Sequence, residues 1–179
     1  MRRQKFYQRL VKWFNDRLVP DLARSFAWVA GGALIGSVGL ITVYIVLRKL
    51  ALYKVYFVEE WSAYLLVLIT YFSLGYTLIK RKHISIDVVV SRLHELPRRV
   101  LRVVGGLSGL GVMIYCLKLS ISFFIYNLES GVVSLSMIHT PMWIPTLFVP
   151  VGLVIFILAI LRYSLQNLIE LVDYLARKG

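Results

Sequence analysis

Residues 26–47 read FAWVAGGALIGSVGLITVYIVL, twenty-two residues without a charged side chain. As an α-helix this stretch would be about 33 Å long, enough to cross the hydrocarbon core of a bilayer. Three further apolar stretches follow it, and the four predicted spans cover residues 26–47, 61–79, 103–126 and 142–161. The pattern predicts an all-α integral membrane protein with four transmembrane helices.

The composition of the whole chain agrees with this prediction. Its 179 residues are 59% hydrophobic and 17% charged, with a mean hydropathy of +0.74, whereas soluble domains contain about 25% charged residues. The first apolar stretch is longer than the core of a signal peptide, and Arg48 and Lys49 follow it instead of a cleavage site, so we expect a retained span. These features exclude an ordinary water-soluble enzyme.

The basic residues predict the orientation in the membrane. The segment 1–25 and the loop 80–102 contain seven Lys and Arg each, and the residues after the fourth span add three, whereas the connections on the opposite side contain three. Because cytoplasmic loops carry the positive excess, we expect both termini in the cytoplasm. The basic residues, which give the chain a net charge of +12, are therefore expected to face phospholipid headgroups, and no nucleic-acid partner is expected.

Two segments outside the spans are predicted to lie in the plane of the membrane. Segment 1–25 places apolar side chains on one face of a helix and basic ones on the others, as interfacial helices do; the alternative is a partly disordered basic tail. The loop between the second and third spans is apolar enough for a short in-plane helix that ends before Pro97. The residues expected at the lipid interface are Phe6, Leu10, Trp13 and Phe14.

The resulting domain organisation has three parts. Segment 1–25 is the interfacial N-terminal helix, residues 26–165 form the four-span membrane domain, and residues 166–179 form a cytoplasmic C-terminal tail. No catalytic, metal-binding or cofactor-binding residue is predicted, because all nine Asp and Glu lie outside the predicted spans, the three His lie outside or at their edges, and Cys116 is the one cysteine. Proton-coupled exporters, two-histidine haem proteins and disulfide oxidoreductases need such groups at membrane depth.

Three charged residues near the spans allow both a structural and a functional interpretation. Lys118 lies inside the third span, where it either extends its side chain to the membrane surface or pairs with Glu129 or with a partner subunit. Glu59 and Glu60 precede the second span, where they complement the helix dipole or contact an external partner.

Glycines are concentrated in the first and third spans. Gly32 and Gly36, and also Gly105 and Gly109, have the GxxxG spacing that lets helices approach closely in lipid. This spacing predicts close packing, either within the chain or against a partner. Pro150 should bend the fourth helix, because the carbonyl of Thr146 loses its amide partner.

Several short motifs, in this order and spacing, resemble one family. They are VEEWSAY at 58–64, HISID at 83–87, SGVVSLS at 130–136, PMWIP at 141–145 and PVG at 150–152. Over about residues 55–165 the chain resembles the small membrane subunit, the Q-type or DctQ-like protein, of tripartite ATP-independent periplasmic (TRAP) transporters. The motif residues singled out are His83, Asp87, Glu59, Glu60, Gly131, Ser134, Pro141, Trp143, Pro150 and Gly152.

This resemblance implies a partner-dependent function in a bacterial inner membrane. A periplasmic binding protein would deliver an organic acid, such as a sugar acid or dicarboxylate, to a large multi-span subunit that uses the sodium gradient. The present chain would pack against that subunit as a scaffold. His83 and Asp87 would then either fix the turn after the second span or simply form a polar loop. The competing interpretation is a free-standing four-span transporter or channel that acts as a homo-oligomer, which would need a polar path through the membrane.

Overall fold

The computed structural model describes residues 17–50, 56–80, 95–136 and 138–178, and four long helices account for most of them. The helices are α2 (Val19–Lys49), α3 (Tyr56–Lys80), α5 (Glu95–Glu129) and α6 (Trp143–Lys178). Each is long and apolar enough to cross a membrane, and the described residues contain no strand beyond an isolated bridge between Val133 and Pro141. The prediction of an all-α protein with four spans is confirmed. The two predicted in-plane helices lie mainly in 1–16 and 81–94, outside the described residues.

The helices extend beyond the predicted spans. α5 has 35 residues and α6 has 36, which correspond to about 52 and 54 Å, whereas the hydrocarbon core is about 30 Å thick. α5 begins at Glu95 and so places Pro97 in its first turn, where a missing N–H costs nothing. The segment 166–178, predicted as a tail, is a continuation of α6. Helical hydrogen bonding does not have to stop at the membrane surface, so the length of an apolar stretch underestimates the length of the helix that contains it.

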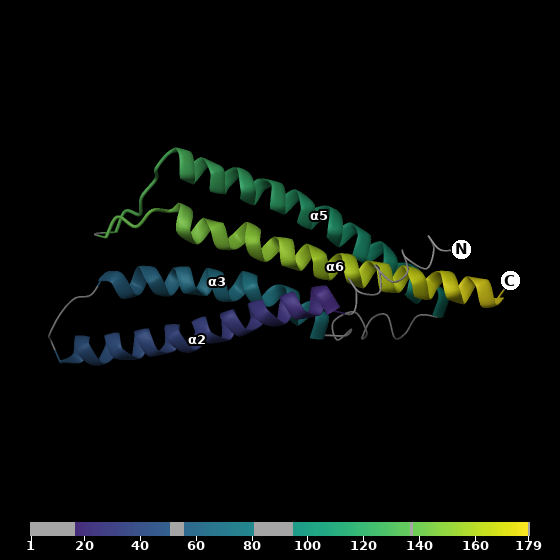
Figure 1. Ribbon diagram of the computed structural model, residues 1–179, viewed down its shortest axis with the longest axis horizontal. Coiled ribbons are helices and arrows are strands. Elements are labelled where there is room, and N and C mark those ends of the chain that lie inside the picture. The colour runs from purple at the N-terminus through teal and green to yellow at the C-terminus, as the bar shows by residue number, and fades with distance from the viewer. Residues whose placement is uncertain (1–16, 51–55, 81–94, 137, 179) are drawn as a thin grey trace.

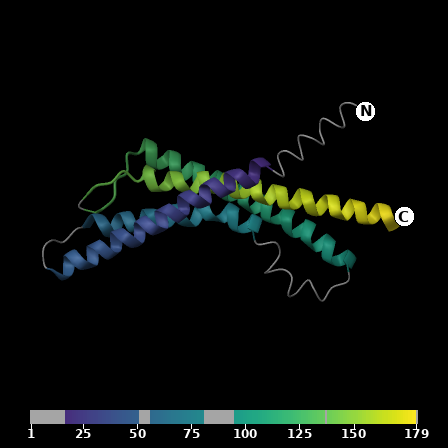
Figure 2. The same cartoon turned by 60° about the horizontal axis from the view of Figure 1, so that its bottom comes forward.

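The four helices lie in an open row in the order α2, α3, α6, α5 (Figure 1). α6 packs along α3 on one side and α5 on the other, and α2 packs along α3. The second view shows α2 crossing the row obliquely, so that its beginning also contacts α6 (Figure 2). Consecutive helices run in opposite directions. α2 therefore begins at the same end of the row at which α6 finishes.

Burial is concentrated in α6, which contacts all three of the other helices. In the most apolar stretch of α6, 44% of the residues are buried, compared with 6–11% in the other three helices. Its buried side chains include Leu153, Ile155 and Ala159. The row therefore has a central helix but no closed core of the kind found in a compact four-helix bundle.

Close contacts along α6 define how the row is assembled. Gly75 on α3 lies against Ile155, and Gly152 on α6 lies against Tyr71, so α3 and α6 approach at two successive levels. Gly106 on α5 lies against Ser164. At each of these contacts one helix has a glycine and so no side chain, which allows the two backbones to approach more closely than larger residues would.

Aromatic side chains join α2 to this packed centre. The ring of Phe72 on α3 lies 4.7 Å from that of Phe26 on α2 and 6.1 Å from that of Phe148 on α6, both edge to face. Phe72 is buried. At the end of the row where α5 begins, the guanidinium of Arg99 lies 4.6 Å from the ring centre of Tyr174 on α6. Two aromatic contacts and one cationic contact thus join neighbouring helices at different levels of the row.

Candidate partner interface

The two edges of the row present continuous apolar surface. α2 and α5 each pack along one principal neighbour, so much of their circumference is uncovered (Figure 1). Trp28 and Ile35 on α2 are 77% and 76% exposed, and Tyr115 on α5 is 63% exposed. A soluble protein rarely exposes apolar surface of this extent. In a membrane, lipid or another protein must cover it.

The glycines predicted at helix contacts lie on these uncovered edges. A Cβ added at Gly32, Gly36, Gly105 or Gly109 would have no neighbouring atom within 4 Å. The GxxxG pairs therefore make no close contact within the described part of the chain, and their packing against a partner stays a prediction. The close contacts within the chain use other glycines, namely Gly75, Gly106 and Gly152.

Lys118 also lies on an exposed part of the α5 edge. Glu129 lies eleven positions after Lys118, which corresponds to about 16 Å along the helix. That separation is too large for a direct ion pair between the two side chains along a straight helix. Extension to the membrane surface and pairing with a partner subunit remain the two interpretations of this lysine.

Glu60 connects α3 to the loop between α5 and α6. Tyr64, one turn later on α3, donates its hydroxyl to Glu60 Oε1 at 2.5 Å, and Ser136 donates to Oε2 at 2.5 Å. The Tyr64 hydroxyl oxygen also lies 3.7 Å from the sulfur of Met142, just before α6. Both carboxylate oxygens are therefore bonded to hydroxyl groups, which form strong hydrogen bonds with a charged acceptor.

Glu59 makes a separate contact. It lies in the first turn of α3, where a carboxylate complements the helix dipole, and the hydroxyl of Tyr44 on α2 donates to its Oε1 at 3.3 Å. This contact joins the end of α2 to the beginning of α3. The two adjacent carboxylates thus tie two different elements to the same helix terminus.

The loop that Glu60 holds consists of residues 130–136 and 138–142 and is called here the outer hairpin. The amide of Ser134 donates to the carbonyl of Thr140, and that of Met142 to the carbonyl of Val132, both at 2.9 Å. The hairpin leaves α5 through Gly131, whose φ of +59° is one that glycine adopts without strain. An antiparallel bridge between Val133 and Pro141 pairs the two arms of the hairpin. The motif residues Gly131, Ser134 and Pro141 therefore shape one folded element.

Three other motif residues belong to α6. Trp143 begins the helix and Pro150 lies inside it. Thr146, one turn before Pro150, donates its hydroxyl to the carbonyls of Met142 and Trp143 at 2.9 and 3.1 Å. Gly152 forms the contact with Tyr71 described above. These residues determine how α6 begins and where α3 can approach it.

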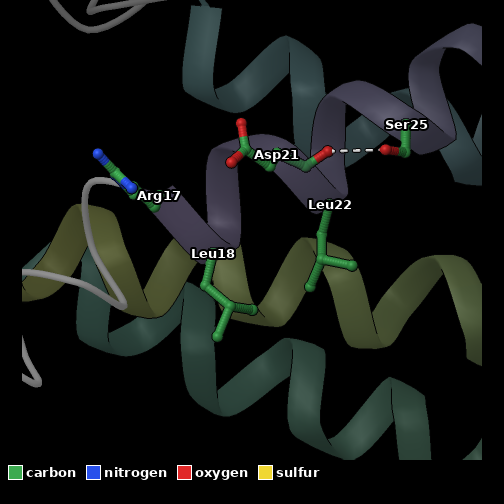
Figure 3. A pocket seen from close by; sticks show the side chains of 5 residues that line it. All are labelled: Arg17, Leu18, Asp21, Leu22 and Ser25. Atoms are coloured by element: carbon green, nitrogen blue, oxygen red, sulfur yellow. Dashed lines mark hydrogen bonds between the residues drawn. The ribbon is translucent and has the colours of Figure 1, made fainter.

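A hollow of about 370 Å³ lies beside the first turns of α2 (Figure 3). Leu18 and Leu22 project from one side of the helix, and Arg17 and Asp21 project from another. The hydroxyl of Ser25 donates to the carbonyl of Asp21 at 3.0 Å. The hollow is lined by one helical stretch, and the Ser25 hydroxyl in it bonds to a backbone carbonyl instead of a side-chain base. The lining residues are Arg17, Leu18, Asp21, Leu22 and Ser25.

Some predicted site residues cannot be placed. His83 and Asp87, and the lipid-facing Phe6, Leu10, Trp13 and Phe14, lie outside the described residues. Within the described ranges, no group of three or more His, Cys, Asp and Glu side chains could hold a metal ion. The site that the structure does assemble is a structural one: two uncovered edges, and a hairpin fixed at one end of the row.

Comparison with known families identifies the type of protein. The sequence profile of the DctQ component of tripartite ATP-independent periplasmic transporters matches residues 37–170, well over half of the chain. The chain belongs to the DctQ family. No curated protein and no solved structure gives a significant match. DctQ proteins are components of transporters and work in general with a large membrane subunit and a periplasmic binding protein.

The DctQ match includes the outer hairpin and the α5 edge. It begins within α2, after Gly32 and Gly36, and ends within α6. The sequence motifs point to Glu60 and Ser134 but do not predict the roles of Tyr64, Ser136 or Gly75. Tyr64 follows Glu60 by four residues, a spacing that places both on one face of a helix. No spacing rule relates Glu60 to Ser136, which lies 76 positions later.

Proposed function

We propose that this chain is the small scaffold subunit of a sodium-driven TRAP transporter that imports an organic acid, such as a sugar acid or dicarboxylate. The solute and sodium sites belong, on this proposal, to the large membrane subunit, and a periplasmic binding protein supplies the solute. The complex lies in a bacterial inner membrane with both termini of this chain in the cytoplasm. Membership of the DctQ family supports the general role.

The open row of helices is the observation that carries the scaffold role. Four helices that served as a self-sufficient transporter would be expected to enclose a path, whereas here α2 and α5 lie at opposite edges of one row. Apolar area alone gives little drive for association in lipid, so a stable partner contact needs close packing and a few polar groups. The uncovered glycines and Lys118 offer both along the edges.

The distribution of charge supports the same proposal. Lys118 in α5 is the one charged residue within the four predicted spans, and Arg162, midway along α6, follows directly after the fourth span. An ion-coupled transporter generally places ionisable groups near the middle of the membrane. A chain whose middle is apolar is better suited to enlarging and anchoring another subunit.

Co-purification and uptake test this function together. The large membrane subunit of the same transporter should co-purify with this chain in a one-to-one ratio. Proteoliposomes with both subunits and the binding protein should take up the acid only in a sodium gradient. Uptake without this chain would reject the scaffold role. Sodium-dependent uptake by this chain alone would instead support the homo-oligomeric transporter.

A further inference from the structure

The outer hairpin exposes a leucine at its tip. Leu135 is 107% exposed, so its side chain is not packed against the described part of the chain. Val133 and Ile138 on the same hairpin are 44% and 40% exposed. An isolated exposed leucine is unremarkable on a protein surface, but three apolar side chains on one short loop form a patch that suits a partner.

The hairpin holds this patch in a defined conformation. Its own backbone bonds join Ser134 to Thr140 and Val132 to Met142, and within the turn the amides of Ser136 and Ile138 donate to the hydroxyls of Ser134 and Ser136 at 3.2 and 3.3 Å. Glu60 then bonds the hairpin to α3 through Ser136. A loop ordered before binding loses less conformational entropy when it binds, which favours affinity.

The position of the patch separates it from the helix edges. The hairpin lies at the end of the row opposite the start of α2 and the finish of α6, and it projects past the first turn of α6 (Figure 1). The large membrane subunit would meet the edges of α2 and α5 along their length. A side chain at the tip of a loop beyond the helices is accessible to a partner that arrives from the aqueous phase.

We propose that the outer hairpin docks the periplasmic binding protein, with Leu135 as its apolar anchor and Glu60 as a positioning residue. This inference rests on the proposed function, which places this end of the row in the periplasm. Residues 130–142 contain no Lys or Arg, Glu129 directly precedes them, and Glu60 bonds to Ser136. The complementary surface on the binding protein is therefore an apolar recess with a neutral or basic rim.

Binding of the purified binding protein to the assembled two-subunit complex in nanodiscs provides the test. Leu135→Ser should raise the Kd by about ten- to a hundred-fold, the loss expected for an anchor-sized leucine, and Leu135→Met should stay close to wild type. Leu50→Ser is the matched control, because Leu50 is 62% exposed at the same end of the row but lies outside the hairpin. In uptake assays Leu135→Ser should raise the binding-protein concentration needed for half-maximal transport and leave the maximal rate unchanged.

Two outcomes would overturn the docking role while the proposed function stands. The first is a wild-type Kd for the binding protein in Leu135→Ser. A polarity-sensitive probe attached to Leu135→Cys, in a Cys116→Ser background, would then show whether lipid surrounds the tip instead. The second is loss of the large subunit from the Leu135→Ser complex, which would assign the patch to that subunit. Failure of the wild-type chain to form the complex would instead reject the proposed function and this inference with it.

Discussion

Gly152 on α6 lies directly against the backbone of Tyr71 on α3: a Cβ at Gly152 would stand 2.7 Å from the Tyr71 carbonyl oxygen. A backbone atom cannot move away as a flexible side chain can. This contact therefore determines how closely α3 and α6, the two inner helices of the row, approach each other.

Gly152→Ala should destabilise the isolated chain in detergent. Overpacking of this kind costs typically about 1–3 kcal/mol, and the higher helix propensity of alanine, about 1 kcal/mol, would offset part of it. Gly36→Ala is the control, because nothing lies within 4 Å of a Cβ there. Thermal unfolding followed by circular dichroism should show a lower midpoint for Gly152→Ala alone. Equal midpoints for the two variants would show that α3 and α6 are not in this contact.

Gly36→Ile and Gly109→Ile should leave the isolated chain folded, since both positions face open space. On the proposed function, the variant whose edge contacts the large subunit should lose co-purification, and the other should retain it. Gly31→Ile and Gly111→Ile are controls on other faces of the same helices. The glycine contact would be rejected if the double variant kept both the complex and its uptake activity.

Phe72→Ala should weaken the attachment of α2 to the row. Phe72 is buried between Phe26 and Phe148, and truncation of a buried phenylalanine costs typically about 3–5 kcal/mol. Leu66→Ala on the same helix should have little effect, because Leu66 is 63% exposed. Unfolding in mixed micelles would measure the free energy of unfolding of both variants. A similarly small decrease in the two variants would mean that the aromatic contacts do not stabilise the row.

Glu60→Ala and Ser136→Ala should each loosen the outer hairpin without unfolding the helices. Both remove the bond between α3 and the hairpin, so hydrogen exchange of residues 130–136 should become several-fold faster in either variant. The double variant should exchange no faster than the singles, because they break the same contact. Additive effects would show that Glu60 and Ser136 act independently.

Sequence alone determined the number of spans, their alternation and the position of the charged segments. These follow from two strong constraints: the bilayer requires a minimum apolar length, and charged residues are costly within it. The four spans at 26–47, 61–79, 103–126 and 142–161 each fall within one of the four helices, apart from Met142 just before α6. The helix ends were less predictable, because α5 and α6 continue into polar segments such as 166–178.

Only the tertiary structure decided which faces of these helices meet. In lipid both the outside of a bundle and its contacts are apolar, so the pattern of a span does not reveal how the helix is rotated about its axis. The glycines with GxxxG spacing, such as Gly32 and Gly36, face open space, whereas Gly75 and Gly152 make the close contacts. The bond between Glu60 and Ser136 likewise joins residues 76 positions apart, and it depends on α6 bringing the hairpin back to the beginning of α3.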